Sequence, residues 1–95
     1  MKIRWSKAAE ADLNAIHHYI MNKNPRAADD VNRRIVSSSR RLLDFPEIGR
    51  STDRLLFRLL PVTGLPYLLL YRVSKDYIEI GSVIDGRMKR APDLF

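Results

Sequence analysis

The stretch YLLLYRVSKDYIEIGSVI at residues 67–84 decides the fold class of this chain. Its first seven residues are mostly apolar on both faces, which indicates a strand in the centre of a sheet. The tripeptide SKD at 74–76 then turns the chain. Residues 77–84 return as a second strand with Ile78, Ile80 and Ile84 on one side. The stretch therefore predicts an antiparallel hairpin inside a β-sheet.

A third strand is expected just before this hairpin. The segment RLLFRLL at 54–60 has a strand pattern, and PVTGLP at 61–66 has the residues of a turn. In this arrangement Leu56, Leu60, Leu68 and Leu70 share the sheet face away from the helices, together with Arg72. Because a monomer rarely leaves such an apolar face open, we expect a segment from a partner protein to cover it.

The first half of the chain predicts a short strand and two helices. Ile3 and Trp5 alternate with basic residues, as in a strand, and Ser6 can cap the helix that follows. Asn24 and Pro25 begin a second helix, which cannot easily pass Pro46. The apolar stripes of the two helices are Ala9, Leu13, Ile16 and Ile20, then Ala28, Val31, Ile35 and Leu42. The chain is thus expected to be one α+β domain, 1–95, with an N-terminal strand and a helical hairpin packed on a small, mainly antiparallel sheet.

The composition narrows the functional classes. The 95 residues are 45% hydrophobic and carry a formal charge of +6, which favours acidic partners. The absence of cysteine excludes disulfides and thiolate metal sites, and two histidines alone do not predict a zinc site, so we expect no metal and no cofactor. With neither a signal peptide nor a membrane span in the sequence, we expect a cytoplasmic protein.

Several segments, in order, resemble the RelE/ParE superfamily of bacterial toxins from type II toxin–antitoxin pairs. They are AEADLNAIHHYI, NPRAADDVNRRI, LLDFPEIGR, FRLLPV, YLLLYRV and IEIGSVIDGR. The helices and the NPxAA motif are more similar to the ParE branch. The resemblance implies a toxin that forms a hetero-oligomer with its cognate antitoxin and is neutralised by it. It also implies one of two actions, because ParE-like members poison DNA gyrase and RelE-like members cleave mRNA in the ribosome.

The residues favour the gyrase inhibitor over the ribonuclease. Metal-independent RNA cleavage needs an acid and a base beside cations, and Arg58, Arg72 and Arg87 are the candidate cations. No His or Tyr follows Arg87, and the position before Gly86 that is often His in the family is Asp85. A carboxylate there would repel phosphate. A RelE-like endonuclease using the three arginines is retained as the alternative.

Two other groups of side chains could supply an acid or a base. His17 and His18 are adjacent on a helix, so they point about 100° apart and cannot serve one site. We expect both at the surface. Tyr71 lies in an apolar strand and is expected in the core.

The main hypothesis is therefore a toxin that binds its target without catalysis. The candidate contacts with gyrase or antitoxin are Arg50, Arg58, Arg72, Arg87, Lys89 and Arg90. Since an unpaired buried charge is costly, Arg58 either points to solvent or anchors an acidic group of the partner. A basic nucleic-acid-binding module is a third hypothesis, because Arg26, Arg33 and Arg40 recur at seven-residue spacing. No recognition-helix motif or interleaved aromatic accompanies that ridge, so we do not expect direct nucleic-acid binding.

Overall fold

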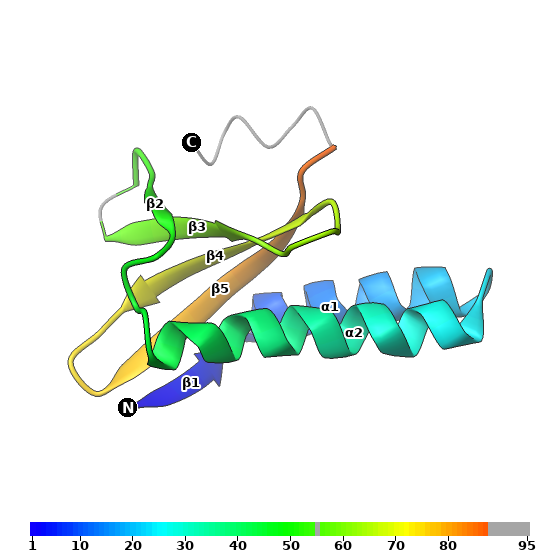
Figure 1. The fold of residues 1–95 in the computed structure, drawn as a ribbon, viewed down its shortest axis with the longest axis horizontal. Coiled ribbons are helices and arrows are strands. Elements are labelled where there is room, and N and C mark those ends of the chain that lie inside the picture. Colours follow the sequence, from blue (N-terminus) through cyan, green and yellow to red (C-terminus); the bar gives the residue numbers. More distant parts are fainter. Residues whose placement is uncertain (55, 88–95) are drawn as a thin grey trace.

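The computed structural model describes residues 1–54 and 56–87, and it consists of a five-stranded sheet with two helices (Figure 1). In chain order the elements are β1 (Lys2–Trp5), α1 (Lys7–Met21), α2 (Pro25–Arg40), the 3-10 turn η1 (Arg41–Leu43), β2 (Arg50–Ser51), β3 (Phe57–Pro61), β4 (Tyr67–Val73) and β5 (Tyr77–Asp85). The sheet order is β1-β5-β4-β3-β2, with β1 parallel to β5 and the other pairs antiparallel. The predicted fold class is confirmed, as is the hairpin of β4 and β5. Ile84, however, lies on the opposite face from Ile78 and Ile80, so their predicted common side was wrong, because an irregularity shifts the β4–β5 register between them.

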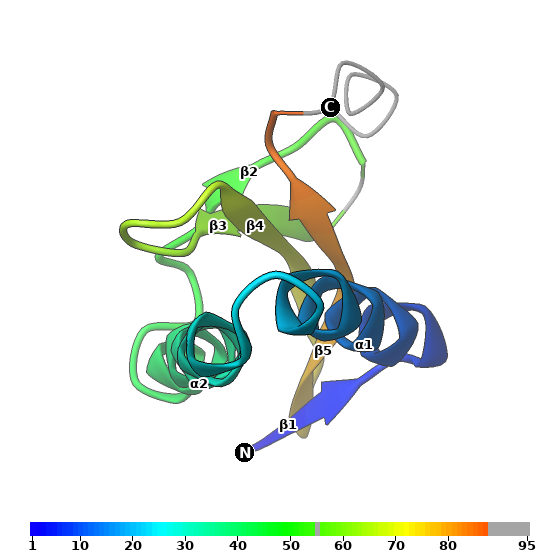
Figure 2. The ribbon, with the colours of Figure 1, turned by 90° about the vertical axis from the view of Figure 1, so that its right-hand side faces the viewer.

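The two helices begin where the sequence predicts. The Ser6 side chain accepts a hydrogen bond from the Ala9 amide at 3.0 Å, and the Asn24 side chain accepts one from the Ala27 amide at 3.2 Å. Each bond satisfies an amide that the first turn of a helix leaves unpaired. Figure 2, which looks along the helices, shows both on one side of the sheet. Their apolar stripes meet buried residues of β4 and β5 there to form the main core.

The third strand starts later than predicted. Leu56 precedes β3 and has a φ of 69°, a left-handed conformation that does not fit a strand, so the predicted strand at 54–60 is corrected to Phe57–Pro61. The pairing register of β3 with β4 also differs from the arrangement we expected, and it decides which leucines share a face. Leu59 pairs with Leu70, whereas Leu60 pairs with Leu69 and joins the core under the helices. A slip of one residue moves a side chain to the other face of a sheet.

The sheet face away from the helices carries a second apolar cluster. Leu59, Leu70 and Ile84 are its buried members, with Phe57 and Leu68 half-buried beside them. The expectation was therefore right in placing Leu68 and Leu70 on this face, but wrong for Leu60, which lies under the helices, and for Leu56, which precedes β3. Arg72 lies on this face, as predicted, because it pairs in register with Phe57.

Side chains at the start of α1 form hydrogen bonds with the part of β5 that extends past β1. The Ser6 hydroxyl donates to the Gly81 carbonyl at 3.0 Å. The Asp12 carboxylate accepts from the Val83 amide at 2.9 Å and from the Ser82 hydroxyl at 2.8 Å. Asp12 thus ties α1 to the sheet. In the described part of the chain, no helix is long and apolar enough to cross a membrane.

Candidate functional site

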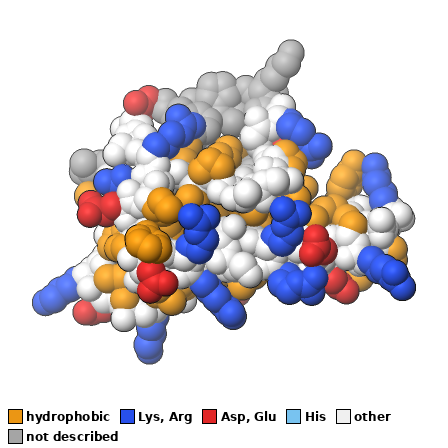
Figure 3. All heavy atoms as spheres, in the orientation of Figure 1, with side chains coloured by type: hydrophobic (Ala, Val, Ile, Leu, Met, Phe, Trp, Pro, Cys, Tyr) orange, Lys and Arg blue, Asp and Glu red, His pale blue; other side chains and the backbone are white. Residues whose placement is uncertain are grey.

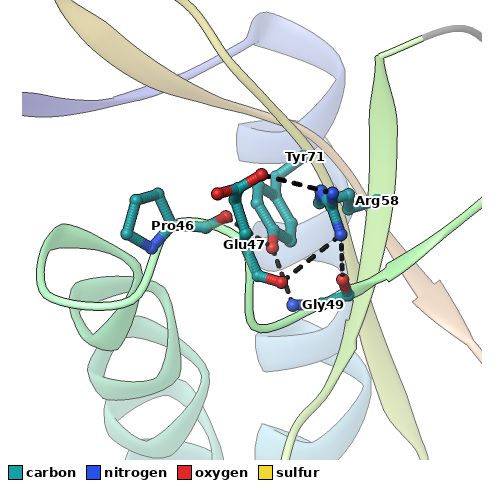
Figure 4. A network of polar contacts seen from close by, with 5 residues as sticks. All are labelled: Pro46, Glu47, Gly49, Arg58 and Tyr71. Atoms are coloured by element: carbon teal, nitrogen blue, oxygen red, sulfur yellow. Dashed lines mark hydrogen bonds and ion pairs between the residues drawn. The ribbon is translucent and has the colours of Figure 1, made fainter.

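The segment that follows the second helix is held in place by Tyr71 (Figure 4). This side chain is fully buried, as predicted. Its hydroxyl accepts a hydrogen bond from the Gly49 amide at 2.9 Å and donates one to the Pro46 carbonyl at 2.8 Å. Burial raises the pKa of Tyr71, and the bond from Gly49 partly opposes that rise. The hydroxyl is therefore a neutral structural group that fixes residues 46–49 on the sheet.

Arg58, on the neighbouring strand β3, binds the same segment. It pairs in register with Tyr71, and its Nη1 donates to the Gly49 carbonyl at 2.7 Å and to the Glu47 carbonyl at 3.3 Å. Its Nη2 lies 3.6 Å from the Glu47 carboxylate. Neither predicted alternative for Arg58 is correct. Its guanidinium does not point freely to solvent, and it does not need a carboxylate from a partner, because backbone carbonyls and Glu47 already compensate its charge. We call Pro46, Glu47, Gly49, Arg58 and Tyr71 the loop clamp.

Position 49 requires glycine because neighbouring atoms lie too close for any side chain. A Cβ atom at this position would lie 2.7 Å from the Tyr71 hydroxyl and 2.8 Å from the Leu59 carbonyl oxygen. Its φ is not left-handed, so the position does not need glycine for its backbone conformation. The missing side chain is what lets the loop approach β3 and β4.

Arg72 lies on the opposite face of the sheet from Arg58. Its Nε donates to the Glu79 carboxylate at 3.1 Å, and its guanidinium lies 5.5 Å from the centre of the Phe57 ring. Glu79 is its register partner on β5. A carboxylate partner for Arg72 is thus already supplied within the chain, although the Arg72 side chain remains 40% exposed.

Arg87 is paired with Asp85 just beyond the last strand. The Asp85 carboxylate accepts from the Arg87 Nε at 3.0 Å, from its Nη2 at 2.8 Å and from its amide at 2.9 Å. These bonds hold the pKa of the Asp85 carboxyl below its ordinary value. The pair lies at one end of a cleft of about 480 Å³ between α1 and the sheet, beside Tyr19 and Tyr67. Asp85 serves to orient Arg87.

The remaining predicted residues are more scattered. Arg50 begins β2 and is exposed, and Lys89 and Arg90 lie outside the described residues. His17 is half-buried with its Nε2 at 3.1 Å from Asp29, and His18 is exposed, so both lie at the surface as predicted. Among residues 1–54 and 56–87, no group of three or more His, Cys, Asp or Glu is arranged to hold a metal ion.

Comparisons with known proteins identify the family. The family model described as the ParE toxin of the type II toxin-antitoxin system, parDE, matches residues 3–90. The chain belongs to the ParE toxin family. It is 35% identical over 88 residues to the putative toxin Y4kP of Sinorhizobium fredii, with 93% of this chain and 91% of the relative covered. It is also 33% identical over 79 residues to the toxin RelE2 of Caulobacter vibrioides, covering 83% of this chain and 88% of the relative.

A solved structure agrees with this assignment to the ParE toxin family. The chromosomal ParDE TA system from P. aeruginosa contains a chain that superposes with a TM-score of 0.79 at 27% identity. The match covers 90% of this chain and 95% of that chain. The chain is therefore a toxin of a type II system with the ParE fold.

In this ParE-family toxin, the three arginines proposed for RNA cleavage do not converge. Arg58 and Arg72 lie on opposite faces because they occupy register positions next to each other. Arg87 follows Asp85, which pairs with Tyr67, five residues before Arg72 on β4. At the rise per residue of a strand, the five residues from Tyr67 to Arg72 span roughly 17 Å along β4. Each arginine is bound to its own carboxylate, so the described residues do not form one cationic site.

The Asp85–Arg87 pair predicts an acid-sensitive contribution to stability. Because the pKa of Asp85 is lowered in the folded protein, the pair stabilises the fold above the ordinary carboxyl pKa, near 4, and this contribution is lost as the pH falls below it. Asp85→Asn should remove that component. We expect thermal melts of the wild type and the variant to converge between about pH 4 and pH 2. A constant difference across this range would contradict the role of the pair.

Proposed function

We propose that this toxin inhibits DNA gyrase by direct protein contact and that a cognate antitoxin neutralises it in a hetero-oligomer. Membership of the ParE toxin family supports the antitoxin part, since the family description names a toxin-antitoxin system, parDE. The solved relative is likewise a ParDE system. The gyrase part follows from the resemblance to ParE-like toxins noted in the sequence. The proposal places the toxin in the cytoplasm, together with bacterial DNA.

The observation that carries the proposal is the separation of Arg58, Arg72 and Arg87. A ribonuclease needs cations, an acid and a base around one phosphate. Here the cations lie on different faces and ends of the sheet, and the nearby hydroxyl of Tyr71 is buried and bonded at both its donor and acceptor positions. This arrangement is poorly suited to catalysis. It is compatible with charged contacts spread over a protein surface.

The proposed contact residues fall into two groups. Arg50, Arg72 and Arg87 have exposed or partly exposed side chains and, with Lys89 and Arg90, are the candidates for direct contact with gyrase or antitoxin. Arg58 acts through the loop clamp, because its guanidinium is committed to Glu47 and Gly49. Its contribution to binding would therefore be to position residues 46–50.

A supercoiling assay with purified toxin tests the proposal. We expect the toxin to block DNA supercoiling by gyrase and to accumulate cleaved plasmid, and we expect the antitoxin to reverse both effects. Programmed ribosomes whose mRNA is cut within codons, with supercoiling unaffected, would instead identify a ribonuclease. Tight, salt-sensitive binding to bare DNA with neither effect would identify a nucleic-acid-binding module.

Charge removal at Arg87 gives a residue-level prediction with a matched control. Arg87 and Arg33 are 67% and 69% exposed, and each is paired with one aspartate, Asp85 and Asp30. We expect Arg87→Gln to weaken gyrase inhibition about tenfold, because it removes a charged contact at the interface. Arg33→Gln should leave inhibition within about twofold. Equal inhibition by the two variants in the supercoiling assay would remove Arg87 from the proposed contact surface.

A further inference from the structure

Tyr19, near the end of α1, is unlike the other three tyrosines of the chain. It is 58% exposed, whereas Tyr67 and Tyr71 are buried and Tyr77 is half-buried. Its hydroxyl oxygen accepts a hydrogen bond from the Lys23 ammonium at 2.8 Å. A cation at the oxygen of an exposed phenol favours the phenolate, which is the nucleophilic form of tyrosine.

The charges around Tyr19 favour the loss of its proton. The hydrogen bond from Lys23, followed by the positive charge of Lys23, lowers the pKa of Tyr19. The Arg87 charge acts in the same direction, while desolvation and the Asp85 charge oppose it. Burial, by contrast, raises the pKa of both buried tyrosines. The hydroxyl of Tyr19 is therefore both accessible and activated.

Tyr19 also lines the cleft of about 480 Å³ between α1 and the sheet, together with Arg87. The Arg87 side chain is 67% exposed, and Asp85 accepts hydrogen bonds from its Nε and Nη2 atoms. A guanidinium has five N–H donors, so donors of Arg87 remain for an anion. Figure 3 shows basic side chains next to apolar ones at the end of the molecule where α1 meets α2.

The cleft combines two kinds of surface that fit the two halves of an acyl phosphate. Ile16 and Val83 supply apolar lining on which an acyl chain can pack. Lys23 and Arg87 are cations, and charge-assisted hydrogen bonds from such groups are well suited to a phosphate. An acyl donor with a phosphate leaving group therefore matches this site better than a neutral donor.

We propose that Tyr19 is a covalent modification site that accepts an acyl group from an acyl phosphate. The phenolate attacks the carbonyl carbon, the bond between that carbon and the phosphate oxygen breaks, and the phosphate leaves with the bonding electron pair. The phenolic proton passes through solvent to the leaving phosphate, so the products are an aryl ester and hydrogen phosphate. Lys23 and Arg87 hold the phosphate and so position the carbonyl carbon at the hydroxyl. This chemistry does not depend on the proposed function.

Incubation of the purified toxin with acetyl phosphate, followed by mass spectrometry of its peptides, tests the proposal. We expect an acetyl ester on Tyr19 that hydroxylamine removes, at about ten times the level found on Tyr77. Lys23→Gln should lower this ester about tenfold, because it removes both the cation at the hydroxyl and a phosphate ligand. Lys7→Gln is the matched control, since Lys7 is exposed at the opposite end of α1. We expect the control to label within about twofold of the wild type.

Inorganic phosphate tests the binding of the leaving group. It should slow the reaction of Tyr19 with acetyl phosphate, because both compete for Lys23 and Arg87. It should leave the reaction with the neutral donor p-nitrophenyl acetate unchanged. Equal effects of phosphate on the two donors would overturn the phosphate-binding role of the cations.

The variant Tyr19→Phe separates the phenol from its neighbours. We expect it to lose the label that hydroxylamine removes and to melt like the wild type, because the lost hydroxyl is exposed. Equal ester on Tyr19 and Tyr77 would overturn the inference. A stable amide on Lys23 without an ester on Tyr19 would also overturn it, by assigning the reactivity to the amine. Gyrase inhibition is measured separately in the supercoiling assay, so none of these outcomes alters the proposed function.

Discussion

Replacing Gly49 with alanine is expected to lower the free energy of unfolding by about 3 kcal/mol, the upper end of the usual cost of overpacking. The added Cβ would lie 2.7 Å from the Tyr71 hydroxyl and 2.8 Å from the Leu59 carbonyl oxygen. Neither neighbour can move cheaply, because one is a buried ring and the other is sheet backbone. For a domain of this size the melting temperature should fall by roughly 12 °C or more.

Gly81→Ala is the matched control for this substitution. A Cβ at Gly81 would lie 3.3 Å from the end of the Phe57 ring and 3.6 Å from the Leu70 carbonyl oxygen. A side chain that is only half-buried can shift by a few tenths of an ångström, so we expect a loss below about 1 kcal/mol. Equal destabilisation by the two alanine variants in urea unfolding would show that Gly49 is not held by close contact.

Tyr71→Phe is expected to cost about 2 kcal/mol of unfolding free energy, the middle of the range for a buried group left without its partner. The ring remains, but the buried Gly49 amide loses its acceptor and the Pro46 carbonyl loses its donor. Tyr77→Phe is the control. Within the described residues the Tyr77 hydroxyl makes no hydrogen bond, and its ring packs against Arg4. We expect that variant to unfold within about 0.5 kcal/mol of the wild type.

The pH dependence of Tyr71→Phe gives a second test of the loop clamp. The pKa of Tyr71 is raised in the folded protein, so its contribution is complete below the ordinary tyrosine pKa, about 10, and is lost as the pH rises above that value. The stability difference between wild type and Tyr71→Phe should therefore shrink above about pH 10. A difference that stays constant up to pH 12 would contradict a buried, neutral hydroxyl.

Local signals in the sequence predicted the helices and the central hairpin. Ser6, Asn24 and Pro25 act within one turn of their own position, so capping rules suffice to place both helix starts. The bounds of β4 follow from an apolar run between two turns. The start of β3 was misplaced because Leu56 looks like a strand residue, while its left-handed backbone is visible only in the folded chain.

Contacts between distant residues could not be predicted in this way. The Tyr71 hydroxyl meets residues 22 and 25 positions earlier, and Asp12 meets residues about 70 positions later. No spacing rule connects such pairs. The sequence therefore predicted that Tyr71 is in the core but not which hydrogen bonds its hydroxyl makes. For Arg58 it left open whether the side chain faces solvent or binds an acidic group of a partner. Asp85 is different, because an aspartate two residues before an arginine is a local signal for their pairing.

The parallel pairing of β1 with β5 also has a consequence for biosynthesis. Residues 2–5 are translated well before their sheet partners, which are residues 77–80. At roughly 5–20 residues per second, β1 stays unpaired for several seconds while the residues between β1 and β5 are translated. Both helices can form in that interval, whereas the sheet cannot close. The sheet can thus be completed only after residues 77–80 have been translated, and until then a nascent chain lacks the finished edge of the sheet.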